Sequence, residues 1–170
     1  MHYLQQNFIQ RVSNCTFTGA NVMILNMKFL KFEIDLDFVL IAITTSLKDY
    51  RICYLINKYL NFNFTKTDDL EAEANEGEAL ARFSQYLYSS ASNRSAFYFI
   101  ANKGAGGYLL PEMRKADYFL MTKNNIDEIE LDSLVSSLNK VPEIVAAVKI
   151  DPKKIKSREK SLILAQIFEV

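Results

Sequence analysis

The sequence predicts an α+β domain with a mainly antiparallel sheet, two principal helices packed on one face of it, and a short C-terminal helical or irregular tail. Three observations lead to this fold class. β-branched and aromatic runs of strand length recur along the chain, two segments carry apolar residues at helical spacing, and short polar or glycine-containing turns separate most of the runs. Strands joined by short turns pair antiparallel, which makes the sheet mainly antiparallel.

Strands begin the patterned part of the chain. Residues 27–35 alternate apolar and charged side chains, as a half-buried strand does. Residues 37–45 form a β-branched apolar run, which predicts a buried strand.

The first helix follows these strands. Ser46 and Asp49 resemble a capping box in which Asp replaces the usual Glu or Gln. Cys53 lies beside the apolar stripe of this helix, so we expect a small core or boundary residue rather than a reactive thiol. The stripe itself repeats at helical spacing and consists of Ile52, Leu55, Ile56, Tyr59 and Leu60.

The middle of the chain predicts loops and hairpins. The acid-rich residues 67–78 lack the spacing of an EF-hand loop, so a solvated loop or edge strand is expected. Residues 80–88 and 96–102 are aromatic and β-prone, and the polar residues between them indicate a hairpin or meander. Residues 102–108, NKGAGGY, match no phosphate-binding glycine pattern and predict a tight turn. Residues 116–123 are a further strand candidate.

The second helix and the last strand lie near the end of the chain. Residues 127–139 carry acids in the first turn and Pro142 just beyond the end. Their helical stripe consists of Leu131, Leu134, Val135 and Leu138. Residues 143–150 predict a strand, and Asp151 before Pro152 is a suitable N-cap and first-turn pair for a closing segment.

Length and periodicity set the domain organisation. The 170 residues are enough for one domain whose core needs neither disulfides nor metal. Residues 1–26 show no periodicity for most of their length, so we expect an N-terminal appendage that is disordered or lies upstream of a natural start at Met23 or Met27. The predicted single α+β domain spans residues 27–170.

Composition restricts the setting of the protein. Lys and Arg number 20, as do Asp and Glu, and this balance disfavours a dedicated nucleic-acid binder. Cys15 and Cys53 are too few for a disulfide framework, which suits a reducing cytoplasm. No apolar run reaches the roughly 20 residues of a membrane span, and no signal peptide is recognisable, so we expect a cytoplasmic protein without a membrane partner.

Histidine chemistry is excluded by the sequence. The one histidine, His2, is at a terminus that is prone to fraying. The sequence therefore disfavours three kinds of site that need a histidine in the folded domain. These are serine or cysteine nucleophiles activated by histidine, two-histidine metal sites and imidazole proton shuttles. We expect no cofactor and no metal, and we favour a protein that is not an enzyme.

One short motif admits a structural and a functional interpretation. Pro111 forces Leu110 into extended backbone, and Asp117 begins the next strand, so the segment can fix a corner of the sheet. In the functional interpretation Glu112 and Asp117 are a general acid and base, with Arg114 or Arg51 binding an anion and Tyr118 donating a hydrogen bond. We favour the corner because nothing in the sequence places the two carboxylates at a working distance.

The same motif carries a family resemblance. Leu110-Pro111-Glu112, three residues, and then Ala116-Asp117-Tyr118 resemble the motif Ile-Pro-Glu-x-x-x-Val-Asp-Tyr of the IPExxxVDY family, a small family of Bacteroidetes proteins. Leu110 and Ala116 depart conservatively from Ile and Val. The resemblance covers residues 28–163 and has no counterpart for residues 1–26. The resemblance implies no particular activity, cofactor or ligand, because the family has none established and its name only spells out the sequence motif.

Three functions follow as hypotheses. The first is a non-catalytic binding or adaptor domain that docks a protein through an aromatic sheet face or through the start of the first helix. Its candidate binding residues are Lys48, Asp49, Tyr50, Arg51, Arg114 and Tyr118. The alternative is a histidine-independent enzyme that acts on a small phosphorylated substrate with Glu112 and Asp117. The third is weak RNA binding through a basic tail that contains Lys153, Lys154, Lys156, Arg158 and Lys160. The sequence leaves the oligomeric state open.

Overall fold

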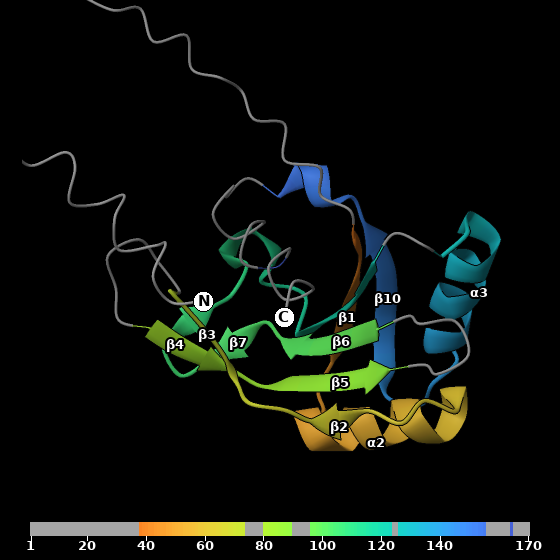
Figure 1. The fold of residues 1–170 in the computed structure, drawn as a ribbon, viewed down its shortest axis with the longest axis horizontal. Coiled ribbons are helices and arrows are strands. Elements are labelled where there is room, and N and C mark those ends of the chain that lie inside the picture. Colours follow the sequence, from red (N-terminus) through yellow and green to blue (C-terminus); the bar gives the residue numbers. More distant parts are fainter. Residues whose placement is uncertain (1–37, 74–79, 90–95, 124–125, 156–163, 165–170) are drawn as a thin grey trace, which may run out of the picture. The chain divides into compact units, whose positions relative to one another are not determined.

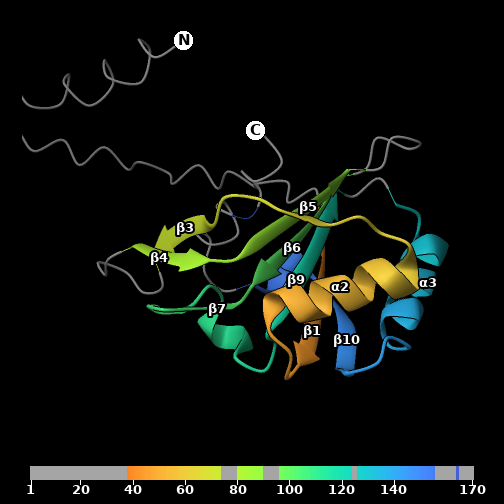
Figure 2. The ribbon, with the colours of Figure 1, turned by 90° about the horizontal axis from the view of Figure 1, so that it is seen from below.

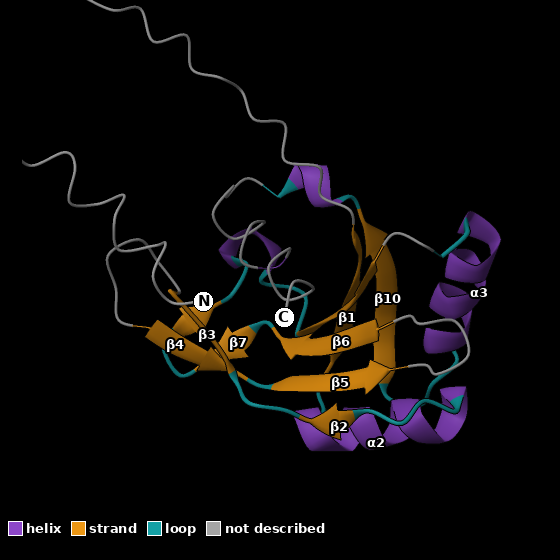
Figure 3. Cartoon of the chain, in the orientation of Figure 1, coloured by secondary structure: helices purple, strands orange, loops and turns teal. Residues whose placement is uncertain are grey.

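The computed structural model describes residues 38–73, 80–89, 96–123, 126–155 and 164. Within them the chain forms the predicted α+β fold, with a sheet of antiparallel strands and two α-helices (Figures 1 and 3). The predicted appendage 1–26, its boundary, the strand 27–35, His2 and Cys15 lie outside the described residues. Most of the basic tail lies outside them too.

The main sheet has six strands in the order β10-β1-β9-β6-β5-β2, and each neighbouring pair is antiparallel. The strand predicted at 37–45 is β1, and it lies between two strands that come from the distant C-terminal half of the chain. The bounds are β1 Phe38–Thr45, β2 Thr65–Lys66, β5 Gln85–Ser89, β6 Ala96–Ala101, β9 Tyr118–Lys123 and β10 Ile144–Ile150.

Both faces of the central strands are buried. Along β1, Val39, Ile41 and Ile43 belong to one apolar core, whereas Phe38 and Leu40 belong to the other. This alternation follows from the two-residue period of a strand, and it explains why the β1 sequence is a continuous apolar run rather than an alternating one.

Helices α2 (Asp49–Leu60) and α3 (Glu128–Leu138) both contribute to the first core, so they pack on one face of the sheet as predicted (Figure 2). Ile52, Cys53 and Ile56 of α2 are buried, which confirms Cys53 as a core residue. Tyr59 is 54% exposed, so the predicted apolar stripe of α2 extends too far.

The two helix starts differ from each other. The predicted capping box at Ser46 and Asp49 is wrong, because Lys48 is the N-cap of α2 and makes no side-chain cap bond. Helix α3 has a standard cap, in which Asp127 Oδ1 accepts a hydrogen bond from the backbone N–H of Glu130 at 2.7 Å.

The second core lies under two hairpins on the other face of the sheet. Strands β3 (Leu70–Glu73) and β4 (Leu80–Phe83) form one hairpin, and β7 (Lys103–Gly104) and β8 (Gly107–Tyr108) form the other. The acid-rich segment thus supplies a strand, and the glycine segment is the tight turn that was predicted. A Cβ on Gly104 would lie 2.5 Å from the carbonyl oxygen of Arg82, so close packing of β7 against β4 requires glycine there.

Two short 3-10 helices complete the described chain, η1 (Pro111–Met113) and η2 (Pro152–Lys154). Asp151 caps η2, since its Oδ1 accepts a hydrogen bond from the N–H of Lys153 at 3.0 Å. No helix within the described ranges is long and apolar enough to cross a membrane.

Candidate functional site

Exposed aromatic side chains gather on helix α2. Tyr50 is 59% exposed and Tyr54 is 63% exposed, and their spacing of one helical turn places them on the same side of the helix. The sheet aromatics Tyr86, Phe97 and Phe99 are instead buried in the first core. Among the described tyrosines, those that are exposed thus lie along α2 rather than on a face of the sheet.

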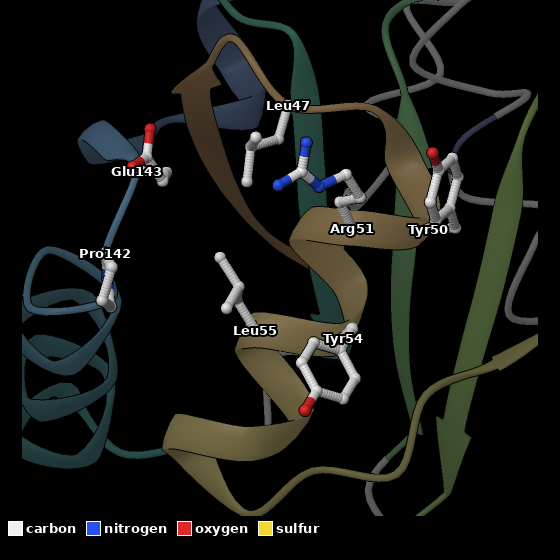
Figure 4. Close-up of a pocket in the computed structure, with 7 residues that line it drawn as sticks. All are labelled: Leu47, Tyr50, Arg51, Tyr54, Leu55, Pro142 and Glu143. Atoms are coloured by element: carbon white, nitrogen blue, oxygen red, sulfur yellow. The ribbon is translucent and has the colours of Figure 1, made fainter.

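A pocket of about 590 Å³ opens beside these tyrosines. One wall comes from α2 and the loop before it, and the other comes from the turn between α3 and β10. In Figure 4 the side chains of Arg51 and Leu55 extend from α2 toward the space in front of Pro142 and Glu143. The complete lining is Leu47, Tyr50, Arg51, Tyr54, Leu55, Pro142 and Glu143.

The pocket carries one charge of each sign, and neither is neutralised inside the described part of the chain. The ion pairs found there are Lys66 with Asp69, Arg82 with Glu71 and Lys149 with Glu128. Arg51 is exposed at the start of a helix and Glu143 is exposed on the opposite wall. The guanidinium of Arg51 is therefore available to an external carboxylate.

Glu143 has an unusual backbone. Its φ angle is 70°, in the left-handed region that residues with a Cβ seldom adopt. Such backbone strain often occurs at functional sites, and here it shapes the turn that forms one wall of the pocket.

A small network of hydrogen bonds joins the two walls. Thr45 Oγ1 donates to the carbonyl oxygen of Glu143 at 2.8 Å and accepts from the N–H of Leu47 at 3.2 Å. Asp117 Oδ2 accepts from the N–H of Thr45 at 2.9 Å, and Tyr118 Oη donates to the carbonyl oxygen of Leu47 at 2.9 Å.

Asp49 lies behind the helix start rather than in the pocket. Its Oδ2 accepts a hydrogen bond from Tyr86 Oη at 3.2 Å. Burial acts to raise the pKa of Asp49, but hydrogen bonds from Ser84, the Tyr50 N–H and Tyr86, together with the charge of Lys66, outweigh it and lower the pKa. The carboxylate is thus ionised and engaged inside the protein.

The thiol of Cys53 is unreactive. Burial and then the nearby charge of Asp49 raise the pKa of its thiol to about 12. A thiol with this pKa is not a nucleophile near neutral pH, which agrees with its place in the core.

The motif at residues 110–118 builds a corner of the fold. Leu110 is buried with extended backbone, as predicted, and η1 follows it. The fully buried Asn102 organises this corner: its Nδ2 donates to the carbonyl oxygens of Met113 and Ala116, and its Oδ1 accepts from the N–H of Leu110. Tyr118 and Phe119 face opposite cores, again as predicted.

The candidate residues of this motif separate in the structure. Asp117 and Tyr118 reach the loop before α2, whereas Glu112 is exposed on η1 and Arg114 lies over the ring of Tyr108, with 5.7 Å to its centroid. Neither Glu112 nor Asp117 lines the pocket beside α2. An acid and base role for the two carboxylates remains a hypothesis.

Several residues of this site had no sequence signal. Thr45 is the last residue of an apolar strand, and Pro142 had a sufficient explanation as a helix terminator. Asn102 precedes the glycines of a predicted turn, and Glu143 follows Pro142, so the local pattern at both positions indicates only a turn. Their roles come from contacts between distant parts of the chain, which no local pattern encodes.

Comparisons with known proteins gave no match. A scan against protein-family models found none, and searches of curated proteins and of solved structures also found none. The resemblance to the IPExxxVDY family therefore stays a prediction from the motif.

Proposed function

We propose that the protein is a non-catalytic binding module that takes up a segment of a protein partner in the pocket beside α2. The observation that carries the proposal is the grouping of two exposed tyrosines and Arg51 around a pocket with leucine and proline walls, and Arg51 forms no ion pair with another described residue. Tyrosine and arginine are enriched in protein interfaces and in their binding hot spots.

The pocket lining indicates the chemistry of the partner segment. Leu47, Leu55 and Pro142 favour an apolar side chain, and a volume of about 590 Å³ holds a group of that size. Arg51 favours a carboxylate next to it, and the positive end of the α2 dipole adds to that preference. Glu143 repels a carboxylate from the opposite wall and so fixes the direction in which the segment binds.

The surroundings of the carboxylates also support binding over catalysis. Asp117 and Asp49 already accept hydrogen bonds from groups of the fold, and these bonds stabilise the loop and the helix start. We further propose a cytoplasmic location, on the sequence ground that two cysteines are too few for a disulfide framework.

A capture experiment tests the proposal. The full chain, the double variant Arg51→Ala with Tyr54→Ala, and the control Tyr59→Ala are immobilised and exposed to extract of the cells that express the protein. Tyr59 is an exposed tyrosine of the same helix that does not line the pocket, so its variant should behave like the wild type. The proposal requires a protein that the double variant loses at least tenfold and the control retains. Equal capture by all three chains would overturn it.

A peptide selection tests the partner chemistry separately. Random peptides displayed on phage and selected on the wild-type protein should be enriched in an apolar residue adjacent to Asp or Glu. The variant Arg51→Glu should lose the preference for the acidic residue. A wild-type selection without acidic residues would contradict the role of Arg51.

A further inference from the structure

The two walls of the pocket come from segments far apart in the sequence. Leu47 follows β1, whereas Glu143 precedes β10. Strand pairing is irregular beside the pocket, because the register of β1 against β10 shifts between Thr44 and Thr45 and the pairing ends with Thr45 opposite Ile144. Such an irregularity interrupts the ladder of backbone hydrogen bonds where the pocket begins.

The Thr45 hydroxyl bridges this interruption. Thr45 is 5% exposed, and its hydroxyl is engaged on both sides, donating to the Glu143 carbonyl oxygen at 2.8 Å and accepting from the Leu47 N–H at 3.2 Å. One buried group thus contacts the backbone of both walls. An isosteric side chain without the hydroxyl would fill the same space and lose both contacts.

The left-handed backbone of Glu143 makes this contact more important. A residue with a Cβ keeps a φ of 70° only where the surroundings enforce it. The hydrogen bond from Thr45 to the carbonyl oxygen of Glu143 is one such constraint. Others are the pairing of Ile144 with Thr45 and the bond from the Ile144 N–H to the Val141 carbonyl oxygen, so loss of the Thr45 hydroxyl should loosen the position of Glu143 relative to Leu47 without unfolding the turn.

Asp117 and Tyr118 of the motif bind the backbone of the same segment, Thr45 to Leu47. Asp117 Oδ2 holds the N–H of Thr45 and the Tyr118 hydroxyl holds the carbonyl oxygen of Leu47, each at 2.9 Å. Tyr118 itself is fixed by stacking on Phe99, with 4.9 Å between ring centroids and 18° between planes. These two side chains therefore fix the loop that carries one wall.

We propose that Thr45 is the positioning residue of the pocket and that Asp117 and Tyr118 act through it and through Leu47 to hold the walls at the separation that binding needs. The inference rests on the proposed function for the use of the pocket. The hydrogen bonds between the Thr45 hydroxyl and the backbone of Glu143 and Leu47 do not depend on that function, and their effect on the pocket can be measured without a partner.

The first test measures amide hydrogen exchange by NMR in the full chain. In Thr45→Val the Leu47 amide should exchange at least tenfold faster, beyond any change common to the core amides, whereas Thr45→Ser should keep wild-type exchange because it retains the hydroxyl. Thr44→Val is the matched control, since Thr44 donates to the Lys115 carbonyl oxygen and does not line the pocket. A Leu47 amide that changes only as the core does would overturn the proposal.

The second test uses 3-phenylpropanoate, an apolar ring with a carboxylate, as a probe of the pocket. It should shift the methyl signals of Leu47 and Leu55, with about tenfold weaker binding to Thr45→Val and unchanged binding to Thr44→Val. Equal binding to Thr45→Val would refute the positioning role. A wild-type protein whose pocket methyls do not respond would count against the proposed function alone, because the exchange result still decides the role of Thr45.

Tyr118→Phe protects the tests against a variant that fails to fold. It removes the hydroxyl that holds the Leu47 carbonyl oxygen and keeps the ring that stacks on Phe99. We expect faster exchange at Leu47 and weaker binding of the probe. Wild-type values in both measurements for this variant would show that the motif does not position the pocket.

Discussion

The side chain of Asn139 pairs with the backbone of Ala147 as a neighbouring strand would. Its Nδ2 donates to the Ala147 carbonyl oxygen at 2.9 Å, and its Oδ1 accepts from the Ala147 N–H at 2.9 Å. Ala147 lies on β10, the last strand of the sheet in the described part of the chain. Asn139 thus occupies backbone groups that an edge strand would otherwise offer to another chain.

Replacement of Asn139 by Ala should weaken the fold and expose this edge. Loss of two bonds to partly buried backbone groups should lower the free energy of unfolding by about 1–3 kcal/mol. Because Val145 is 77% exposed and Val148 is 54% exposed on the same strand, self-association should increase with concentration. Urea unfolding and sedimentation velocity measure the two effects. A free energy of unfolding equal to that of the wild type would show that water can replace the hydrogen bonds of the Asn139 amide with no loss of stability.

A matched variant separates the edge effect from the loss of stability. Val148→Lys, introduced into the Asn139→Ala background, should suppress self-association because an exposed lysine on an edge strand opposes pairing. It should leave the lowered stability unchanged. Persisting self-association would place the contact elsewhere.

Thr122 on β9 supplies a prediction of increased stability. Its hydroxyl is buried and has no hydrogen-bond partner among the described residues. The neighbours in register are Val39 and Phe97, both in the first core. Thr122→Val should therefore raise the free energy of unfolding by about 1 kcal/mol, because it removes an unsatisfied polar group and keeps the shape. Thr122→Ser, which keeps the hydroxyl and loses the methyl group, should lower it; urea unfolding measures both.

Backbone strain at Glu143 supplies a second stabilising change. Glu143→Gly should raise the free energy of unfolding by about 1 kcal/mol, since glycine adopts a positive φ without the Cβ clash. Glu143→Ala is the control, because it removes the same charge and keeps the Cβ. Thermal unfolding should show a higher Tm for Gly than for Ala. Equal Tm values would mean that the strain is negligible or that glycine loses as much through the unfolded state.

The fold class and most elements followed from local periodicity. The apolar run at β1 and the helical spacing of α2 and α3 each reflect neighbours within one element, which is what a sequence pattern records. The extent of a buried face is another matter. Tyr59 shares the spacing of Ile52 and Ile56 yet is 54% exposed, because spacing tells which residues share a face and not how far that face is covered.

The candidate site was harder to predict, for a physical reason. Its walls meet through the hydrogen bond from Thr45 to Glu143, two residues separated by 98 positions. The failed capping box is a related case. Asp49 has a partner across the fold in Tyr86, and a carboxylate with that partner does not need to cap its own helix. Side chains with tertiary partners depart from the roles that local spacing suggests.

The lowered pKa of Asp49 gives stability a defined dependence on pH. Burial acts to raise this pKa, and the hydrogen bonds from Ser84, the Tyr50 N–H and Tyr86, with the charge of Lys66, more than reverse it. A carboxyl whose pKa is lower in the folded than in the unfolded state stabilises the fold above its unfolded pKa of about 3.9 and loses that contribution as the pH falls through the folded value. The contribution should therefore be complete at pH 7 and decline below about pH 4.

The variant Asp49→Asn tests this dependence. It keeps the shape and removes the charge, so it should be less stable than the wild type at pH 7, and the difference should shrink as the pH falls toward 3. Urea unfolding at a series of pH values gives the difference directly. Asp69→Asn is a suitable control, because Asp69 is an exposed partner of Lys66 and such surface pairs contribute little. A difference between Asp49→Asn and the wild type that is the same at pH 7 and pH 3 would show that the hydrogen bonds act without the charge.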